Sequence, residues 1–163
     1  MSVNELLYDL PSDVADSLKS AAFAQAPHVT AQRRAFHALP ELGWQEVETT
    51  ATIVADLKDA GYDVVSGPEF LGDTVRMGMS ADPIPGEGDT GCIALFDTGR
   101  PGPTVCMRVD IDALPITEAG GNHAPFAQGY ASRKPGGMHA CGHDGHAAIG
   151  LATARVIRPY LES

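Results

Sequence analysis

The run TVCMRVDI over residues 104–111 constrains the fold more than any other stretch of the sequence. In an extended chain Val105, Met107 and Val109 point to one face, while Cys106 points to the other. A run that is apolar on both faces is typical of a central strand covered by helices. The sequence therefore predicts a sheet with this strand in its interior.

The segments around this run favour helices, which together with the strands predict a layered α/β domain. Four apolar residues within 44–61 recur at helical spacing, and Thr30 is expected to cap another helix that Pro40 closes. The residues on that stripe are Val47, Ala51, Val54 and Leu57. The remaining expected elements are helices over 13–25, 31–39 and 144–157, strands over 62–66 and 92–97, and a long surface loop over 67–91.

Length, charge and cysteine content narrow the class of protein. The 163 residues suit one domain, and the net charge of −10 argues against nucleic-acid binding, which needs a basic face to displace counterions. Residues 1–18 lack the basic start of a signal peptide, and no apolar run is as long as a membrane span. The three cysteines fit neither a disulfide framework nor a CxxC metal site. We expect a cytoplasmic protein that binds neither nucleic acid nor membranes.

Two aspartates, Asp110 and Asp112, end the expected central strand and project to the same side of it. Carboxylates at the carboxyl end of a strand lie where open α/β sheets bind their ligands. For an isolated Asp-x-Asp pattern, however, capping of the following turn is the commoner role. These residues alone leave both alternatives open.

The densest group of potential metal ligands lies in the stretch GGMHACGHDGH. Cys141 and His143 stand two positions apart, so in an extended segment both side chains can face one ion, and zinc prefers thiolate and imidazole ligands. Asp144 can orient a neighbouring imidazole or cap the helix that starts there. His139 and His146 can be ligands, substrate contacts or packing residues, and packing is the commoner role. A Cys–His catalytic dyad fits less well, because residues this close in sequence do not face each other as nucleophile and base. We predict a metal site that the aspartate pair completes in part.

Three blocks of the sequence resemble the N-terminal part of the M20 family of metal-dependent amidohydrolases and peptidases. They are RRAFHALPELGWQEVETT, GPTVCMRVDIDALPITE and GGMHACGHDGHAAIGLATA. The blocks follow the family's order from about residue 33 to residue 157, and three collinear blocks are far more specific than one motif. Within the family, the sequence is most similar to the branch with N-acyl-amino-acid, hippurate and aminobenzoyl-glutamate hydrolases.

The resemblance implies roles for the residues at matching positions. Cys141 and His143 correspond to metal ligands, and the thiolate is placed to bridge two divalent ions, Zn or Mn. Asp112 corresponds to the catalytic aspartate beside the metals, which orients a ligand. Four further residues are expected to support the ligands or to contact substrate: Asp110, His139, Asp144 and His146. His37 and Glu41 match a block to which we assign core and turn roles.

The resemblance also implies the chemistry of the complete protein. Family members have a layered α/β/α zinc-exopeptidase-like catalytic domain, a lid or dimerisation domain, and a general-base glutamate in a later segment. Residues 1–163 correspond only to the N-terminal part of that catalytic domain. We therefore expect the complete protein to hydrolyse p-aminobenzoyl-glutamate or another N-acyl amino acid as a homo- or hetero-oligomer. We expect the isolated chain to be inactive.

Two other interpretations remain. The chain can be a non-catalytic binding or assembly module that keeps the hydrolase half-fold. The missing general base favours this interpretation, and the intact Cys–His and Asp–Asp pairs disfavour it. The chain can also belong to a dipeptidase branch of the family, although that branch usually has histidine at the position of Asp110.

Overall fold

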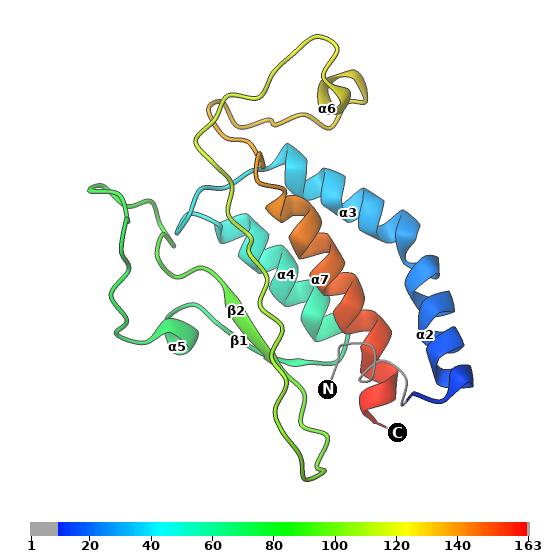
Figure 1. The fold of residues 1–163 in the computed structure, drawn as a ribbon. Coiled ribbons are helices and arrows are strands. Elements are labelled where there is room, and N and C mark those ends of the chain that lie inside the picture. Colours follow the sequence, from blue (N-terminus) through cyan, green and yellow to red (C-terminus); the bar gives the residue numbers. More distant parts are fainter. Residues whose placement is uncertain (1–9, 163) are drawn as a thin grey trace, which may run out of the picture.

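The computed structural model describes residues 10–162, so the expectation for residues 1–18 lies partly outside the described residues. Helix α7 (His143–Ile157) lies between α3 (Ala26–Ala38) and α4 (Val47–Asp59), as Figure 1 shows. Apolar side chains from these three helices form the buried core. They are Phe36, Ile53, Leu57, Ala147, Leu151 and Ala154.

The first two helices of the described residues follow one another with hardly a break. Helix α2 (Ser12–Ala24) matches the expected helix, but α3 begins at Ala26, so the expectation of a cap at Thr30 is wrong. Pro27 lies in the first turn of α3, where its missing N–H leaves no hydrogen bond unmade. The Thr30 hydroxyl, now inside the helix, donates to the Ala26 carbonyl at 2.9 Å.

Helix α4 buries a different face from the expected apolar stripe. Its buried residues are Thr49, Thr50, Ile53 and Leu57. Val47 at the start of the stripe is 36% exposed. Thr50 can turn inward because its hydroxyl accepts a hydrogen bond from the Gly91 backbone N–H at 2.8 Å. A pattern that counts only apolar residues misses this face.

Among residues 10–162 the sheet is a single antiparallel pair of strands. Strand β1 (Asp63–Ser66) pairs with β2 (Cys92–Leu95), and Val64 and Ala94 lie opposite each other. The loop between them carries the short helix α5 (Pro68–Leu71). The inner faces of both strands pack against the helical core, so the helices form one layer and the strands lie against it.

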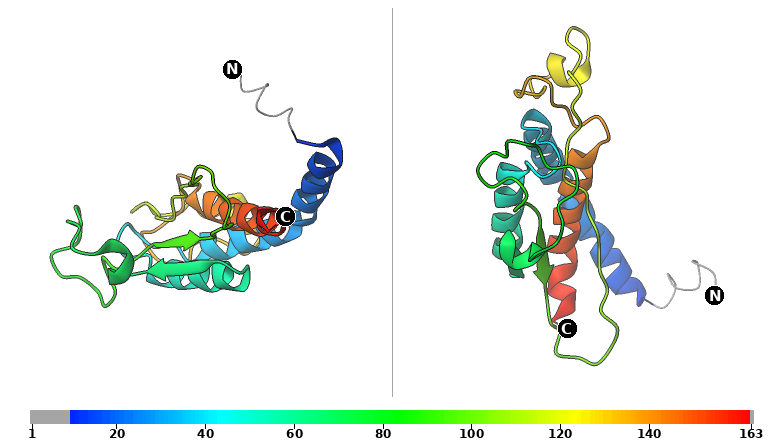
Figure 2. Two further views of the ribbon diagram at one scale, coloured as in Figure 1. Left: turned by 90° about the horizontal axis from the view of Figure 1, so that it is seen from below. Right: turned by 90° about the vertical axis from the view of Figure 1, so that its left-hand side faces the viewer.

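Residues 104–111 are extended but do not form the expected central strand. Within residues 10–162 no strand pairs with this segment, which runs along the outside of α7 (Figures 1 and 2). Val109 packs against the core, but Val105 is 89% exposed and Met107 is 52% exposed. Within residues 10–162 the helices cover one side of this segment, and the layered α/β/α arrangement stays a prediction.

The remaining elements are short. Helix α6 (Ala124–Ala127) lies in the loop before α7, and the 3-10 helix η1 (Arg158–Leu161) follows α7. No helix in the described part of the chain has the length and apolar character to cross a membrane. The described residues thus form an α/β arrangement of one helical layer and one small sheet.

Candidate functional site

Two isolated bridges bring the chemically important segments together. The Ala113 backbone N–H donates to the Glu41 carbonyl at 2.7 Å. Leu114 and Met138 then exchange backbone hydrogen bonds, both 3.0 Å long. The end of the 104–111 segment and the stretch before α7 are thereby held side by side, although more than 20 residues separate them in the sequence.

Asp112 and His143 form the most informative contact at this junction. The Nδ1 atom of His143 lies 2.8 Å from Asp112 Oδ1 and 2.9 Å from the Asp112 backbone oxygen. Because both partners are oxygen acceptors, Nδ1 is the donor, and in the neutral ring Nε2 then keeps its lone pair. A carboxylate that fixes the ring in this way is the usual companion of a metal-binding histidine.

Asp110 and His146 form a second, parallel pair. The Asp110 backbone N–H donates to His146 Nδ1 at 3.1 Å, and Asp110 Oδ2 lies 3.6 Å from the same nitrogen. The neutral ring therefore has its proton on Nε2, where it can donate to a bound molecule. His146 lies one turn after His143, with 6.4 Å between the ring centres. Arg108 also donates to Asp110, at 2.8 Å.

Cys141 lies in a turn immediately before α7, with an exposed and free thiol. The expectation that Cys141 and His143 share one extended segment is wrong. Gly142 between them has a φ of 88°, a left-handed conformation that glycine adopts without strain, and α7 starts at the next residue. The thiol and the imidazole are thus presented by a turn and a helix start.

The donors at this junction fit part of a metal site. A thiol that can ionise and an imidazole with an unprotonated Nε2 are ligands of the type that zinc and similar ions prefer. Among residues 10–162, however, no group of three or more His, Cys, Asp or Glu side chains is close enough to hold a metal ion. The described residues can therefore supply some of the ligands.

Asp144 was expected to orient a neighbouring imidazole. The imidazole that it contacts is that of His37, on helix α3. Asp144 Oδ2 lies 2.7 Å from His37 Nδ1 and 2.8 Å from Arg33 Nε, and the Asp144 side chain is only 1% exposed. Its other oxygen accepts from the Gly145 backbone N–H at 2.8 Å. His37 Nε2 in turn lies 2.8 Å from Glu118 Oε1. Asp144 does not cap α7, because the N-cap residue of this helix is Gly142.

Glu118 accepts several hydrogen bonds on the far side of His37. The Ser132 backbone N–H donates to it, and His123 Nε2 lies 3.0 Å from Oε1. Burial alone would raise the pKa of Glu118, but the donors from Ser132 and His37 outweigh it, so the pKa is lowered. Glu118 is therefore held as a carboxylate.

His139 is buried next to the junction and is 4% exposed. Neither of its ring nitrogens has a hydrogen-bond partner among the described residues. Burial lowers the pKa of His139 by more than the nearby carboxylate of Asp144 raises it. The ring is therefore held neutral.

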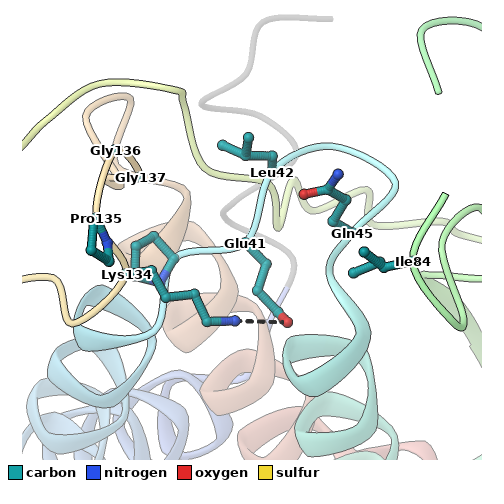
Figure 3. A pocket seen from close by; sticks show the side chains of 9 residues that line it. Glu41, Leu42, Gln45, Ile84, Lys134, Pro135, Gly136 and Gly137 are labelled. Carbon is teal, nitrogen blue, oxygen red and sulfur yellow. Dashed lines mark hydrogen bonds and ion pairs between the residues drawn. The ribbon is translucent and has the colours of Figure 1, made fainter. Parts of the chain in front are cut away.

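Glu41 has the turn role expected of it. Its carboxylate accepts from the Thr49 backbone N–H at 2.8 Å and from that of Glu48 at 3.3 Å, so it satisfies N–H groups at the start of α4. Lys134 Nζ lies 3.2 Å from it. This pair borders a pocket of about 190 Å³ drawn in Figure 3, whose lining includes Gln45 and Gly137 but none of the candidate metal ligands.

Sequence reasoning missed Arg33 and Glu118. Both belong to the blocks that carry the family resemblance, but nothing in either block alone says that these residues meet at His37. Residues 37 and 144 are 107 positions apart. A signal for their contact would have to come from the pairing of α3 with α7, which requires the fold.

Comparisons with known proteins agree on one family. The model of peptidase family M20/M25/M40 matches residues 106–163. Indole-3-acetyl-aspartic acid hydrolase of Enterobacter agglomerans is 40% identical over 83% of this chain and 36% of its own length. One of the subunits of p-aminobenzoyl-glutamate hydrolase from Escherichia coli (strain K12) is 36% identical over 89% of this chain and 38% of its own length.

A solved structure is similar as well. It is described as a dinuclear metal binding peptidase from the M20 family, from Bacillus subtilis, and it matches with a TM-score of 0.63 at 33% identity. The match covers 87% of this chain and 32% of that one. The chain thus spans little more than a third of the length of the curated relatives described above.

Proposed function

Since the chain belongs to peptidase family M20/M25/M40, we propose that the protein is a metal-dependent amide hydrolase. The observation that carries the proposal is the contact of His143 Nδ1 with Asp112 Oδ1, which leaves Nε2 available to a metal, two residues after the exposed thiol of Cys141. The solved relative described as dinuclear supports two divalent ions, Zn or Mn, in the complete protein.

In this proposal Cys141 and His143 hold metal, and Asp112 keeps the His143 ring in its metal-binding tautomer. A bound divalent ion would polarise the amide carbonyl and lower the pKa of water. His146 presents its Nε2 proton toward a bound molecule, and Asp110 fixes that ring through its backbone N–H. The residues that complete the ligand set, and the general base, are proposed to lie outside this chain.

The substrate class we propose is an N-acyl amino acid, with p-aminobenzoyl-glutamate as the first candidate. The names of both curated relatives describe an acidic amino acid joined to an aromatic acyl group. We also propose that residues 1–163 are the N-terminal part of an α/β/α catalytic domain. The chain spans little more than a third of these relatives, which supports a longer polypeptide. A relative named as one subunit of its enzyme supports assembly into an oligomer, and three free cysteines support a cytoplasmic location.

The test is hydrolysis by the protein at its full natural length. We expect release of glutamate or aspartate from p-aminobenzoyl-glutamate or indole-3-acetyl-aspartate, loss of that release with a chelator, and recovery with Zn²⁺ or Mn²⁺. Cys141→Ala should abolish release and lower the metal content. The 163-residue chain alone should be inactive. No release from these substrates or from other N-acyl amino acids under any metal condition would contradict the proposal.

One observation favours a second candidate, a non-catalytic binding or assembly module. It is the absence of a three-residue metal cluster from the described part of the chain. Metal analysis separates the two functions. A full-length protein that is purified without metal, and whose stability does not change when Zn²⁺ or Mn²⁺ is added, would be a module of this kind.

A further inference from the structure

We propose that His37 is a positioning residue that holds the Asp112–His143 pair in register, an inference that rests on the proposed metal-dependent function. His37 lies on α3 and is 2% exposed. One ring nitrogen lies 2.7 Å from Asp144 Oδ2, and the other lies 2.8 Å from Glu118 Oε1. A core and turn role does not account for a ring that joins two buried acids.

The two acids belong to the two segments that meet at the candidate site. Glu118 lies six residues after Asp112, and Asp144 directly follows His143. His37 therefore connects the segment that carries Asp112 to the helix that carries His143. The 2.8 Å contact between Asp112 and His143 closes a ring of contacts through these five residues.

Basic side chains and acids meet in this network. Each ring nitrogen of His37 lies within hydrogen-bond distance of one of the two acids. Arg33 also contacts Asp144, through the 2.8 Å contact of its Nε. A buried carboxylate that lost such a partner would be driven to move toward water.

Such a movement would reach the candidate metal ligand directly. Asp144 also accepts from the Gly145 N–H, so its side chain fixes the first turn of α7 from within. The Asp112 contact orients the His143 ring, and the Asp144–His37 contact holds the backbone to which the ring is attached. Metal ligands depend on both, because the bond from Nε2 to a metal has a narrow range of length and direction.

The test is metal binding by the full-length protein with His37 replaced by Gln. A glutamine is neutral and cannot donate to both carboxylates from one short side chain. We expect Co²⁺ affinity to fall by roughly 10- to 100-fold and the visible absorption bands of bound Co²⁺ to shift, because the ligand geometry changes. Affinity and spectrum equal to those of the unchanged protein would overturn the inference.

A matched control separates positioning from general loss of stability. Glu41→Ala also removes a buried, ion-paired side chain, but one that caps α4 and lies outside the His37 network. We expect it to lower stability and leave the Co²⁺ spectrum unchanged. The same spectral shift in Glu41→Ala as in His37→Gln would count against positioning.

A second variant covers the case in which His37→Gln does not fold. Glu118→Gln keeps the shape of the side chain and an oxygen acceptor but removes the charge, and it should weaken Co²⁺ binding in the same direction. Unaltered binding in that variant would overturn the inference. If the full-length protein without substitutions binds Co²⁺ and hydrolyses its substrate, and the His37→Gln variant binds Co²⁺ equally well, this inference alone is refuted. If the protein without substitutions neither binds Co²⁺ nor hydrolyses a substrate, the proposed function is refuted.

Discussion

Asp112 is the residue on which the chemistry of the junction most depends. Its carboxylate and its backbone oxygen both accept from Nδ1 of His143, so a single residue decides the tautomer of the candidate ligand. The Asp112 side chain is 36% exposed and does not belong to the buried core, so its removal changes the orientation of His143 more than it changes the core. The effect of a substitution should therefore appear in metal binding rather than in folding.

We predict that Asp112→Ala lowers the affinity of the full-length protein for Zn²⁺ or Mn²⁺ by roughly 10- to 100-fold, because the ring can rotate and the ligand nitrogen becomes less basic. Isothermal titration calorimetry measures the change. Asp82→Ala, which replaces an exposed aspartate in the 67–91 loop, is the control and should bind metal like the unchanged protein. Unchanged affinity in Asp112→Ala would remove this residue from the site.

At the scale of elements, the packing of the 104–111 segment on α7 depends on one glycine. A Cβ atom at Gly150 would lie 2.8 Å from Cγ2 of Val109, closer than real contacts allow. Val109 is β-branched and cannot rotate away freely. Gly145, on the first turn of the same helix, has nothing within 4 Å of the corresponding position.

These two glycines give a matched pair of substitutions. We predict that Gly150→Ala lowers the free energy of unfolding by about 1–3 kcal/mol, because the segment must move off α7. Gly145→Ala should instead raise it by up to about 1 kcal/mol, through the better helix propensity of alanine. Urea denaturation measures both. Equal effects would show that Val109 does not pack on α7 as the structure has it.

The elements differ in how well the sequence predicts them. Helices α2 and α7 and the strands β1 and β2 follow from local periodicity and turn residues, which the sequence contains. The start of α3 cannot be predicted in this way, because Pro27 is compatible both with the end of one helix and with the first turn of the next. The buried face of α4 was missed because the burial of Thr50 is offset by a hydrogen bond to Gly91, a partner 41 residues away.

The candidate site also contains residues that the sequence predicts and contacts that only the fold produces. Cys141, His143 and Asp112 could be predicted as candidate site residues from their residue types and from the family resemblance. The contact of His37 with Asp144 could not, because only the packing of α3 on α7 brings them together. The pairing of Asp110 with His146 depends in the same way on where the 104–111 segment lies along α7.

At the scale of the whole molecule, the chain has an open edge. The backbone of residues 104–108 makes no hydrogen bond to other described backbone groups, and the side chain of Val105 points into solvent. An extended, apolar segment with unpaired N–H and C=O groups is a site where another strand can pair. The remainder of the longer polypeptide that we propose is the partner this edge would have.

We predict that the amides of residues 104–108 exchange with deuterium rapidly in the 163-residue chain, while the amides of the α7 core around Leu151 are protected. In the full-length protein the same 104–108 amides should become protected by at least roughly tenfold, because a neighbouring strand pairs with them. Hydrogen exchange followed by mass spectrometry measures both. Equally fast exchange in the two proteins would mean that no strand covers this edge.

The most direct test of the central claim is the position of a metal ion in a crystal of the full-length protein. Anomalous scattering at the zinc or manganese edge locates the ion without assumptions about activity. We expect a peak about 2.3 Å from Cys141 Sγ and about 2.0–2.1 Å from His143 Nε2, with Asp112 still bound to Nδ1 of the same ring. A peak that contacts neither residue, or an ion bound through Nδ1 with Asp112 displaced, would contradict it.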